Sequence, residues 1–300
     1  MSKDFKDKVV VITGASSGIG ECTAILFAQH GANVVLCGRD ERKLSSALQK
    51  CQEISGGNVD KHLAVQGDIT DPQVRRRIIQ QTIDKFGHLD VLVSNAGIMT
   101  ENISLEDATE EAFDLTISTN VKAGFFLIQE AIPHLEKSQG CIVVVSSITS
   151  SIADTNEIIY GMSKAAVDYM TKTYALGLAP KGIRVNAINP TSVSSTRLER
   201  YYCSEEESKL SYLKYALQQP LHGRNSTPEE QAQTILFLAS PAASFITGQC
   251  VKVDGGSSLV GPQVDKTWQI HVFDSGPSVS IISAVLDSHA NSDQKEAELT

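Results

Sequence analysis

Lys8-Val-Val-Val-Ile-Thr-Gly-Ala-Ser-Ser-Gly-Ile-Gly20 is the stretch that decides the fold of this chain. Its first half is short, apolar and β-branched, which predicts a buried parallel strand that ends at Thr13. The glycine-rich segment Gly14–Gly20 follows, and then a helix is predicted over Glu21–His30, ended by Gly31. A strand, a tight loop and a helix in this order are the first unit of a parallel α/β sheet.

The glycine-rich loop is a predicted anion site. Free backbone N–H groups and the positive end of the helix dipole both face a loop at this position. Gly14 permits the tight turn, while Gly18 and Gly20 allow close approach of a pyrophosphate. The spacing is Gly-x₃-Gly-x-Gly rather than the commoner Gly-x-Gly-x-x-Gly, but the mechanics are the same. A flexible strand–helix loop is the alternative; the clear flanking strand and helix favour a dinucleotide site.

The end of the second predicted strand bears on which dinucleotide binds. Asn33–Cys37 reads as a strand, and Gly38-Arg39-Asp40 follows it. An acidic residue at this place bonds the 2′-hydroxyl of the adenosine ribose, whereas a nearby arginine accommodates a 2′-phosphate. Gly38 stands where the acidic residue is expected, so Arg39 favours NADP(H) over NAD. Two alternatives stay open: Arg39 is a solvated loop residue, or Asp40 reaches the ribose and the cofactor is NAD.

Strand and helix patterns alternate through the rest of the first 260 residues. The alternation predicts a single Rossmann-like, doubly wound parallel sheet of about seven strands with helices on both faces. Ligands of such sheets bind beyond the carboxyl ends of the strands. The further elements that we predict are helix Glu41–Ile54, strand His62–Gln66, helix Asp71–Phe86, strand Val91–Ser94, a long helix over about Leu105–Lys137, strand Ile142–Val145, helix Asn156–Ala179, strand Ile183–Asn189, helix Pro228–Ala239 and strand Gln249–Val253.

A second informative stretch begins where the predicted strand Ile142–Val145 ends. Ser147 lies at that end, and Tyr160-Gly-Met-Ser-Lys164 reads as helix, with Asp154, Thr155 or Asn156 as its N-cap. Tyr160 and Lys164 share one helix face, since they are four residues apart. A lysine ammonium favours the phenolate and lowers a tyrosine pKa from its ordinary value of about 10. Together with a serine hydroxyl, these groups suit proton transfer at a carbonyl or alcohol oxygen. An ordinary helix with a half-buried phenol is the alternative.

Composition narrows the range of functions. The chain has 300 residues, of which 41% are hydrophobic and 20% charged, as expected for a globular protein with a sizeable core. Its formal net charge of −9 argues against a nucleic-acid partner, because phosphate binding requires a basic surface. The one basic cluster, Arg75-Arg76-Arg77, lies in a polar predicted helix and is interpreted as a solvated face.

Metal-binding and targeting signals are not found. The six cysteines show no Cys-x-x-Cys spacing and the seven histidines are scattered, so no metal site is predicted. The charged N-terminus lacks the apolar core of a signal peptide. No apolar run approaches the roughly 18 residues of a membrane-spanning helix. A cytoplasmic protein is therefore expected.

Three regions are expected in the chain. Residues 1–261 would form the dinucleotide-binding catalytic domain. A polar segment rich in tyrosine and leucine, at about 191–220, is placed where a substrate lid could lie; a surface helical pair is the alternative. Residues 262–300 would form a C-terminal extension that ends in a polar, partly disordered stretch.

These motifs together resemble the short-chain dehydrogenase/reductase family over about Asp7–Leu259. Ser147, Tyr160, Lys164 and Asn120 fall where the catalytic tetrad of that family falls, including the thirteen-residue step from serine to tyrosine. Ser94, Thr191 and Ser195 depart from the usual pattern of the family. The resemblance implies that the cofactor-binding residues are Gly14, Ser16, Ser17, Gly18, Ile19, Gly20, Arg39, Asp68, Ile69, Asn95, Ala96, Gly97, Tyr160, Lys164, Pro190, Val193 and Ser195.

The same resemblance implies an activity. Hydride would pass between the nicotinamide of NADP(H) and the carbonyl carbon of a small-molecule substrate. Tyr160 would give or take the proton, Lys164 would stabilise its phenolate, Ser147 would polarise the substrate oxygen, and Asn120 would help to place Lys164 and a proton-relay water. A homodimer or homotetramer is also implied. An NAD-dependent dehydrogenase of the same fold and a catalytically silent dinucleotide-binding protein are the alternatives.

Overall fold

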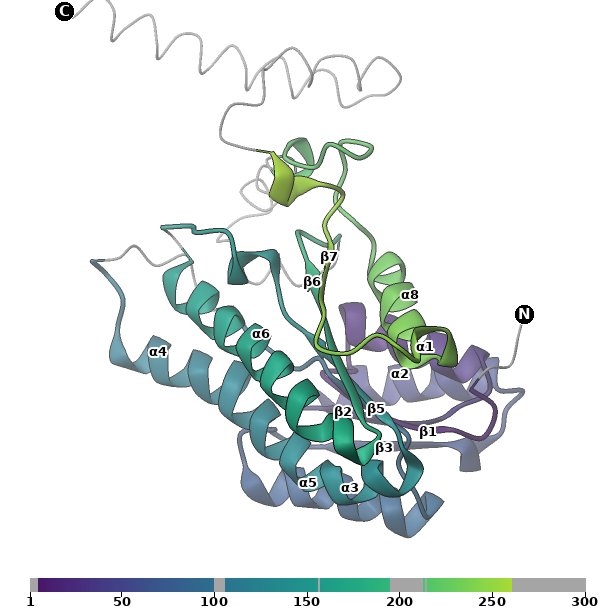
Figure 1. The fold of residues 1–300 in the computed structure, drawn as a ribbon. Coiled ribbons are helices and arrows are strands. Elements are labelled where there is room, and N and C mark those ends of the chain that lie inside the picture. Colours follow the sequence, from purple (N-terminus) through teal and green to yellow (C-terminus); the bar gives the residue numbers. More distant parts are fainter. Residues whose placement is uncertain (1–4, 100–105, 156, 195–212, 214, 261–300) are drawn as a thin grey trace, which may run out of the picture.

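A computed structural model describes residues 5–99, 106–155, 157–194, 213 and 215–260 of the chain. They contain one seven-stranded sheet with the order β3-β2-β1-β4-β5-β6-β7, and every pair of neighbouring strands is parallel (Figure 1). The order reverses direction between β1 and β4, which is the switch point at which doubly wound sheets bind ligands. The predicted fold class is confirmed.

Valine is the commonest residue of the strands, and the central strands are buried on both faces. Their register brings Thr13 of β1 opposite Cys37 of β2, and Val145 of β5 opposite Ile188 of β6. The carboxyl ends of the strands therefore meet along one edge of the sheet. The strands are β1 (Val9–Thr13), β2 (Asn33–Gly38), β3 (His62–Gln66), β4 (Val91–Ser94), β5 (Cys141–Val145), β6 (Arg184–Pro190) and β7 (Cys250–Val253).

Helices cover both faces of the sheet (Figure 1). One core packs α1, α2 and α8 against the sheet through side chains such as Phe27, Leu44 and Ile235. The core on the other face packs α3, α5 and α6, with Leu127 and Val167 among its members. The α-helices are α1 (Gly18–Gln29), α2 (Glu41–Ile54), α3 (Pro72–Phe86), α4 (Glu110–Ile117), α5 (Ala123–Ser138), α6 (Ile158–Leu178) and α8 (Pro228–Ala239).

Three helix boundaries differ from the sequence prediction. Helix α1 already begins at Gly18, so the last two glycines of the loop form its first turn. The long helix predicted from about Leu105 begins at Glu110, where the Thr109 side chain caps it, and a π-helical segment, Ser118–Lys122, separates α4 from α5. Glu157 is the N-cap residue of α6, in place of the predicted Asp154–Asn156.

The interpretation of the arginine cluster as a solvated face is wrong for Arg75, which is only 4% exposed. Its guanidinium donates hydrogen bonds to the carbonyl oxygens of Ile69 and Thr70, 2.7 and 2.9 Å away, and lies over the Phe126 ring. Arginine is suited to this place because its forked donors can serve several backbone acceptors at once. Arg75 thus holds the loop that follows β3.

Parts of the predicted lid and tail cannot be compared with the structure. Within the predicted lid, residues 195–212 and 214 lie outside the described residues, and so does the whole of the extension from 262 to 300. No helix in the described ranges has both the length and the apolar character needed to cross a membrane.

His62 at the start of β3 is a buried histidine held in its neutral form. It is 2% exposed; its Nδ1 accepts the Val34 N–H, and its Nε2 lies 2.8 Å from the Ser55 hydroxyl. Burial, with a smaller contribution from the nearby charge of Lys61, lowers the pKa of His62 from 6.5 to about 4. A proton on Nδ1 would also break the bond from Val34, so folding and protonation oppose each other.

We expect His62 to make the stability of the protein fall on acidification. Between pH 6.5 and about 4 the unfolded chain takes up a proton that the folded chain does not, so the free energy of unfolding decreases as the pH falls through this range. The loss reaches about 3 kcal/mol at most, at 1.36 kcal/mol per pKa unit. Urea unfolding between pH 7 and 4 measures it. His62→Asn, which keeps an acceptor for Val34, should give a shallower slope; parallel curves would contradict the assignment.

Candidate active site

The glycine-rich loop between β1 and α1 forms a cradle of bare backbone. Gly14 and Gly18 adopt positive φ angles of +66° and +58°, a backbone conformation that residues with a Cβ rarely adopt. Asn95, which follows β4, donates from Nδ2 to the carbonyl oxygens of Thr13 and Gly14, at 2.8 and 3.2 Å. A Cβ on Gly20 would lie 2.5 Å from this Nδ2. Gly20 is therefore required for packing beneath the loop, and Asn95 ties the loop to the neighbouring strand.

The loop ends in a helix N-terminus that is suited to an anion. Ser17 is the N-cap residue of α1, but its side chain makes no capping hydrogen bond. The first N–H groups of the helix therefore face the loop without a side-chain acceptor at the cap position. With the glycine cradle in front of them, these groups fit the pyrophosphate of a dinucleotide.

The end of β2 presents a cation to the same loop. Arg39 follows Gly38 and makes an exposed ion pair with Asp68 at 3.4 Å. Partial burial opposes ionisation of Asp68, but hydrogen bonds from Thr70 and the charge of Arg39 hold its pKa below the ordinary value. The Asp40 carboxylate instead caps α2 by accepting the Lys43 N–H at 3.0 Å. Asp40 is thus engaged at the helix start, whereas within the described part of the chain the Arg39 side chain makes only the weak surface pair with Asp68.

One pocket of about 1400 Å³ runs along the carboxyl edge of the sheet. This volume exceeds that of most small-molecule pockets and leaves room for a dinucleotide with a second ligand. Among the predicted residues, Gly20 and Asn120 do not line it, and Ser195 lies outside the described residues. Those that line it are Gly14, Ser16, Ser17, Gly18, Ile19, Arg39, Asp68, Ile69, Asn95, Ala96, Gly97, Ser147, Tyr160, Lys164, Pro190 and Val193.

Ser147 reaches this pocket from the end of β5. Its side chain is 7% exposed, and its Oγ accepts hydrogen bonds from the backbone N–H and the hydroxyl of Thr149, at 3.2 and 2.9 Å. Because the Oγ accepts the Thr149 N–H, its own hydrogen can be donated to another oxygen. Ser147 lines the pocket and is therefore a candidate hydrogen-bond donor to a ligand there.

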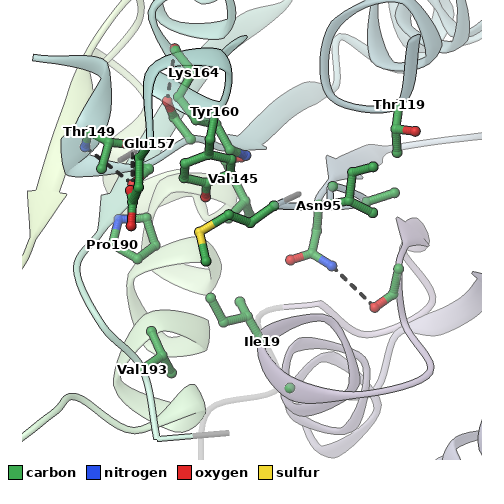
Figure 2. A pocket seen from close by; sticks show the side chains of 18 of the residues that line it. Ile19, Asn95, Thr119, Val145, Thr149, Glu157, Tyr160, Lys164, Pro190 and Val193 are labelled. Carbon is green, nitrogen blue, oxygen red and sulfur yellow. Dashed lines mark hydrogen bonds between the residues drawn. The ribbon is translucent and has the colours of Figure 1, made fainter. Parts of the chain in front are cut away.

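Tyr160 and Lys164 lie on adjacent turns of α6. The Lys164 ammonium is 5.5 Å from the centroid of the Tyr160 ring and donates to the Val145 carbonyl oxygen at 2.9 Å. Lys164 is 4% exposed, so its charge acts on the phenol with little screening by solvent. Figure 2 shows both side chains at the pocket, together with Val145. An ammonium at this place stabilises the negative charge of a phenolate.

Asn120 lies behind the pocket in the π-helical segment between α4 and α5. Its side chain pairs with Ile98, accepting the N–H at 2.7 Å and donating to the carbonyl oxygen at 2.8 Å. It also donates to the Ser163 hydroxyl at 2.9 Å. These bonds connect the loop after β4 to α6, the helix that carries Tyr160. π-Helical turns often mark functional positions.

Sequence reasoning missed Asn189, which precedes Pro190 at the end of β6. Its Nδ2 lies 3.0 Å from the Ser147 carbonyl oxygen, 3.0 Å from the Ser150 hydroxyl and 2.9 Å from an oxygen of Asp168. Asn189 thereby joins the serine loop to α6. Thr149 was missed as well, because no sequence motif identifies a residue that contacts the site through a partner. For Asn189 alone the sequence offered a signal, namely an Asn–Pro pair at the end of a predicted strand.

The fold and site define an oxidoreductase of the Rossmann-like class, with a phenol, an ammonium and a serine hydroxyl beside a glycine-rich nucleotide cradle. Comparison with known proteins agrees. Residues 14–258 match the family described as Enoyl-(Acyl carrier protein) reductase.

Two curated relatives and one solved structure illustrate the similarity. The chain is 39% identical over 253 residues to the 3-oxoacyl-(acyl-carrier-protein) reductase of Thermotoga maritima, covering 84% of this chain and 98% of that protein. It is 36% identical over 255 residues to the L-fucose dehydrogenase of Mus musculus, covering 85% and 90%. The 3-ketoacyl-(acyl-carrier-protein) reductase of Brucella melitensis, solved with NADH, superposes with a TM-score of 0.76 at 33% identity, covering 84% and 99%. The chain belongs to the short-chain dehydrogenase/reductase family and is an enzyme of that type.

Proposed function

We propose that this enzyme interconverts a carbonyl compound and its secondary alcohol with NADP(H). The observation that carries the proposal is the shared pocket, which Ser147, Tyr160 and Lys164 line together with the glycine-rich loop and Arg39. When bound, the nicotinamide dinucleotide supplies or accepts the hydride. All further chemistry falls to side chains of this chain.

In the reducing direction, the Tyr160 hydroxyl would donate its proton to the substrate carbonyl oxygen as that oxygen gains negative charge. Lys164 would stabilise the phenolate that remains, because its ammonium is buried beside the ring. Ser147 would donate a hydrogen bond to the same substrate oxygen, with Thr149 fixing the direction of its hydroxyl. Oxidation of the alcohol follows the reverse course.

Asn120 and Asn189 would act as positioning residues. Asn120 holds the backbone of Ile98 and the α6 residue Ser163, so it maintains the spacing between the loop after β4 and α6. Asn189 holds the carbonyl oxygen of Ser147. Neither side chain needs to contact the reacting atoms for these roles.

NADP(H) is the proposed cofactor because Arg39 lines the pocket and its pair with Asp68 is long and exposed. Asp40 lines the pocket too, but its carboxylate already caps α2. NAD stays the alternative, favoured by the NADH bound in the Brucella melitensis reductase. Gly38 packs against Ser16, since a Cβ there would come within 3.1 Å of the Ser16 hydroxyl. Position 38 therefore has little room for the acidic side chain that would bond a ribose 2′-hydroxyl, and Arg39, the next residue, would meet a 2′-phosphate instead.

Cofactor oxidation tests the proposed function. The consumption of NADPH and of NADH by the full chain is measured with ketones, aldehydes, quinones and 3-oxoacyl thioesters. The affinity for each dinucleotide is measured separately by calorimetry. We expect NADPH-dependent reduction of at least one carbonyl class. Dinucleotide binding without turnover of any class would instead support a catalytically silent protein, and turnover with NADH alone would contradict the cofactor assignment.

A homodimer or homotetramer is proposed on the basis of exposed apolar side chains. They gather on α5 and α6, two helices of one face of the sheet, at Phe125, Phe126, Met162, Tyr169 and Leu176. The exposure of so many large apolar side chains to water is unfavourable, so a second copy of the chain would cover them. Analytical ultracentrifugation that finds only the 32.3 kDa monomer at micromolar concentration would contradict this proposal.

A cytoplasmic location is proposed from the cysteines. The five that the structure describes, Cys22, Cys37, Cys51, Cys141 and Cys250, are all free thiols, as is usual in a reducing compartment. Burial raises the pKa of the Cys51 thiol to about 12, which makes it unreactive. Cell fractionation of the tagged full chain tests the location; recovery in a secreted or membrane fraction would contradict it.

A further inference from the structure

Several acidic side chains line the pocket without a role in the chemistry described above, and Glu157 is the one nearest to Tyr160 in the chain. Glu157 lies one helical turn before Tyr160, whereas Lys164 lies one turn after it. Lys164 bonds the Val145 carbonyl oxygen, and Glu157 lines the pocket from the other side of Tyr160 along α6. Part of a substrate whose carbonyl meets Tyr160 would therefore lie toward Glu157. Figure 2 shows Glu157 on the same wall of the pocket as Thr149 and Tyr160, with Pro190 nearby.

Glu157 is not explained by helix capping. It is the N-cap residue of α6, but its side chain makes no capping hydrogen bond. Among the described residues, its carboxylate receives one hydrogen bond, from the Tyr215 hydroxyl at a long 3.4 Å. Burial and the neighbouring charge of Asp154 raise the pKa of Glu157, and the bond from Tyr215 only partly offsets them. A carboxylate with about four acceptor positions thus has acceptor capacity to spare at the pocket wall.

The surroundings of Glu157 suit a neutral ligand with hydroxyl groups. The described residues that line the pocket include only two cations, Arg39 at the nucleotide loop and Lys164 beside Tyr160. Asp154 and Glu157 would therefore repel an anionic group on the substrate. Neutral groups that both donate and accept hydrogen bonds, as hydroxyls do, also line the pocket, namely Thr149, Ser192, Tyr215 and Gln218, beside apolar side chains such as Met99 and Ile148.

We propose that Glu157 is a specificity residue that accepts a hydrogen bond from a substrate hydroxyl close to the reacting carbon. The substrates are then neutral hydroxy-carbonyl compounds and the corresponding vicinal diols, and carbonyl compounds with an adjacent anionic group are disfavoured. This inference rests on the proposed carbonyl reduction. It adds the class of substrate, which the shared phenol, ammonium and serine do not specify.

Three probes of similar size separate the possibilities. Hydroxyacetone carries the hydroxyl, 2-butanone replaces it with a methyl group, and pyruvate carries an anion. We expect kcat/KM for the wild-type enzyme to be 10- to 100-fold higher for hydroxyacetone than for 2-butanone, the range for a hydrogen bond to a charged group, and lowest for pyruvate. Glu157→Leu should bring the ratio of kcat/KM for hydroxyacetone to that for 2-butanone close to one, and calorimetric binding of NADPH shows that the variant is folded.

Glu157→Gln distinguishes charge from hydrogen bonding. Its amide oxygen still accepts a hydrogen bond, so most of the preference for hydroxyacetone should persist, whereas the discrimination against pyruvate should weaken. Glu110→Leu, the same change at an exposed glutamate of α4 outside the pocket lining, is the matched control and should alter neither ratio.

The outcomes keep the two proposals apart. If no carbonyl compound is turned over in the wider assay, the proposed function fails. If 2-butanone is reduced as well as hydroxyacetone, or if Glu157→Leu slows both equally, the role of Glu157 is overturned while carbonyl reduction stands. A wild-type preference for pyruvate would overturn it as well.

Discussion

Tyr160→Phe is expected to lower kcat/KM for carbonyl reduction by about 10²- to 10⁴-fold, the usual contribution of a positioned general acid. The substitution removes one hydroxyl group and leaves the ring beside Lys164 in place. Dinucleotide affinity should therefore change little, since the glycine-rich loop and Arg39 are untouched. Steady-state rates with the best substrate of the carbonyl panel, beside calorimetric binding of NADPH, measure both quantities.

Tyr169→Phe is the matched control for this experiment. Tyr169 lies on the same helix, but its side chain is 74% exposed and is not part of the pocket. The same loss of a hydroxyl there keeps the ring that the proposed second copy would cover, so the rate should stay within about twofold. Turnover that survives in Tyr160→Phe would remove the phenol from the mechanism, and with it the reaction class proposed for this site.

Arg39→Ala is expected to weaken NADPH binding by 10- to 100-fold, because hydrogen bonds to charged groups contribute about 1.5–3 kcal/mol. NADH, which has no 2′-phosphate, should bind about as before. The ion pair that Arg39 makes with Asp68 is exposed and long at 3.4 Å, so its loss should not disturb the fold. Calorimetric titration of both dinucleotides into the variant and the wild-type enzyme measures the difference.

Arg42→Ala serves as the control for overall charge. Arg42 is an exposed residue in the first turn of α2 and does not line the pocket, although it lies three residues from Arg39. A general electrostatic effect would weaken NADPH binding in both variants, whereas a specific phosphate contact would affect Arg39→Ala alone. Equal losses of NADPH and NADH affinity in Arg39→Ala would refute the phosphate assignment and favour NAD.

Much of the fold could be predicted from the sequence because its signals are local. Short valine- and isoleucine-rich runs alternate with amphipathic helices, and this alternation defines a parallel sheet irrespective of detailed packing. The glycine-rich loop combines a strand end, a tight turn and a helix start within a few residues. Tyr160 and Lys164 could be paired for the same reason, since a spacing of four on one helix brings them together.

The prediction was less accurate where a distant contact overrides a local pattern. Arg75 was interpreted as solvated because its neighbours are polar and basic, yet its guanidinium is buried under the carbonyl groups that follow β3. The long helix before β5 was predicted to be continuous, but the segment at Ser118–Lys122 widens to a π-helix, where Asn120 reaches Ile98 and Ser163. Ile98 and Ser163 are far from Asn120 in the chain, and Phe126, whose ring the Arg75 guanidinium covers, is far from Arg75, so no local pattern reports these contacts.

By itself, the sequence determined that this chain builds a Rossmann-like sheet with a glycine-rich loop at one edge. It also indicated Ser147, Tyr160 and Lys164 as a group. Both features follow from the spacing of residues along a strand or a helix. Only the tertiary structure decided how these groups are held. It directed the Ser147 hydroxyl through Thr149, tied the serine loop to α6 through Asn189, and left Glu157 facing the pocket without a capping role. Those arrangements depend on contacts between separate elements, which form only when the sheet and its helices pack together.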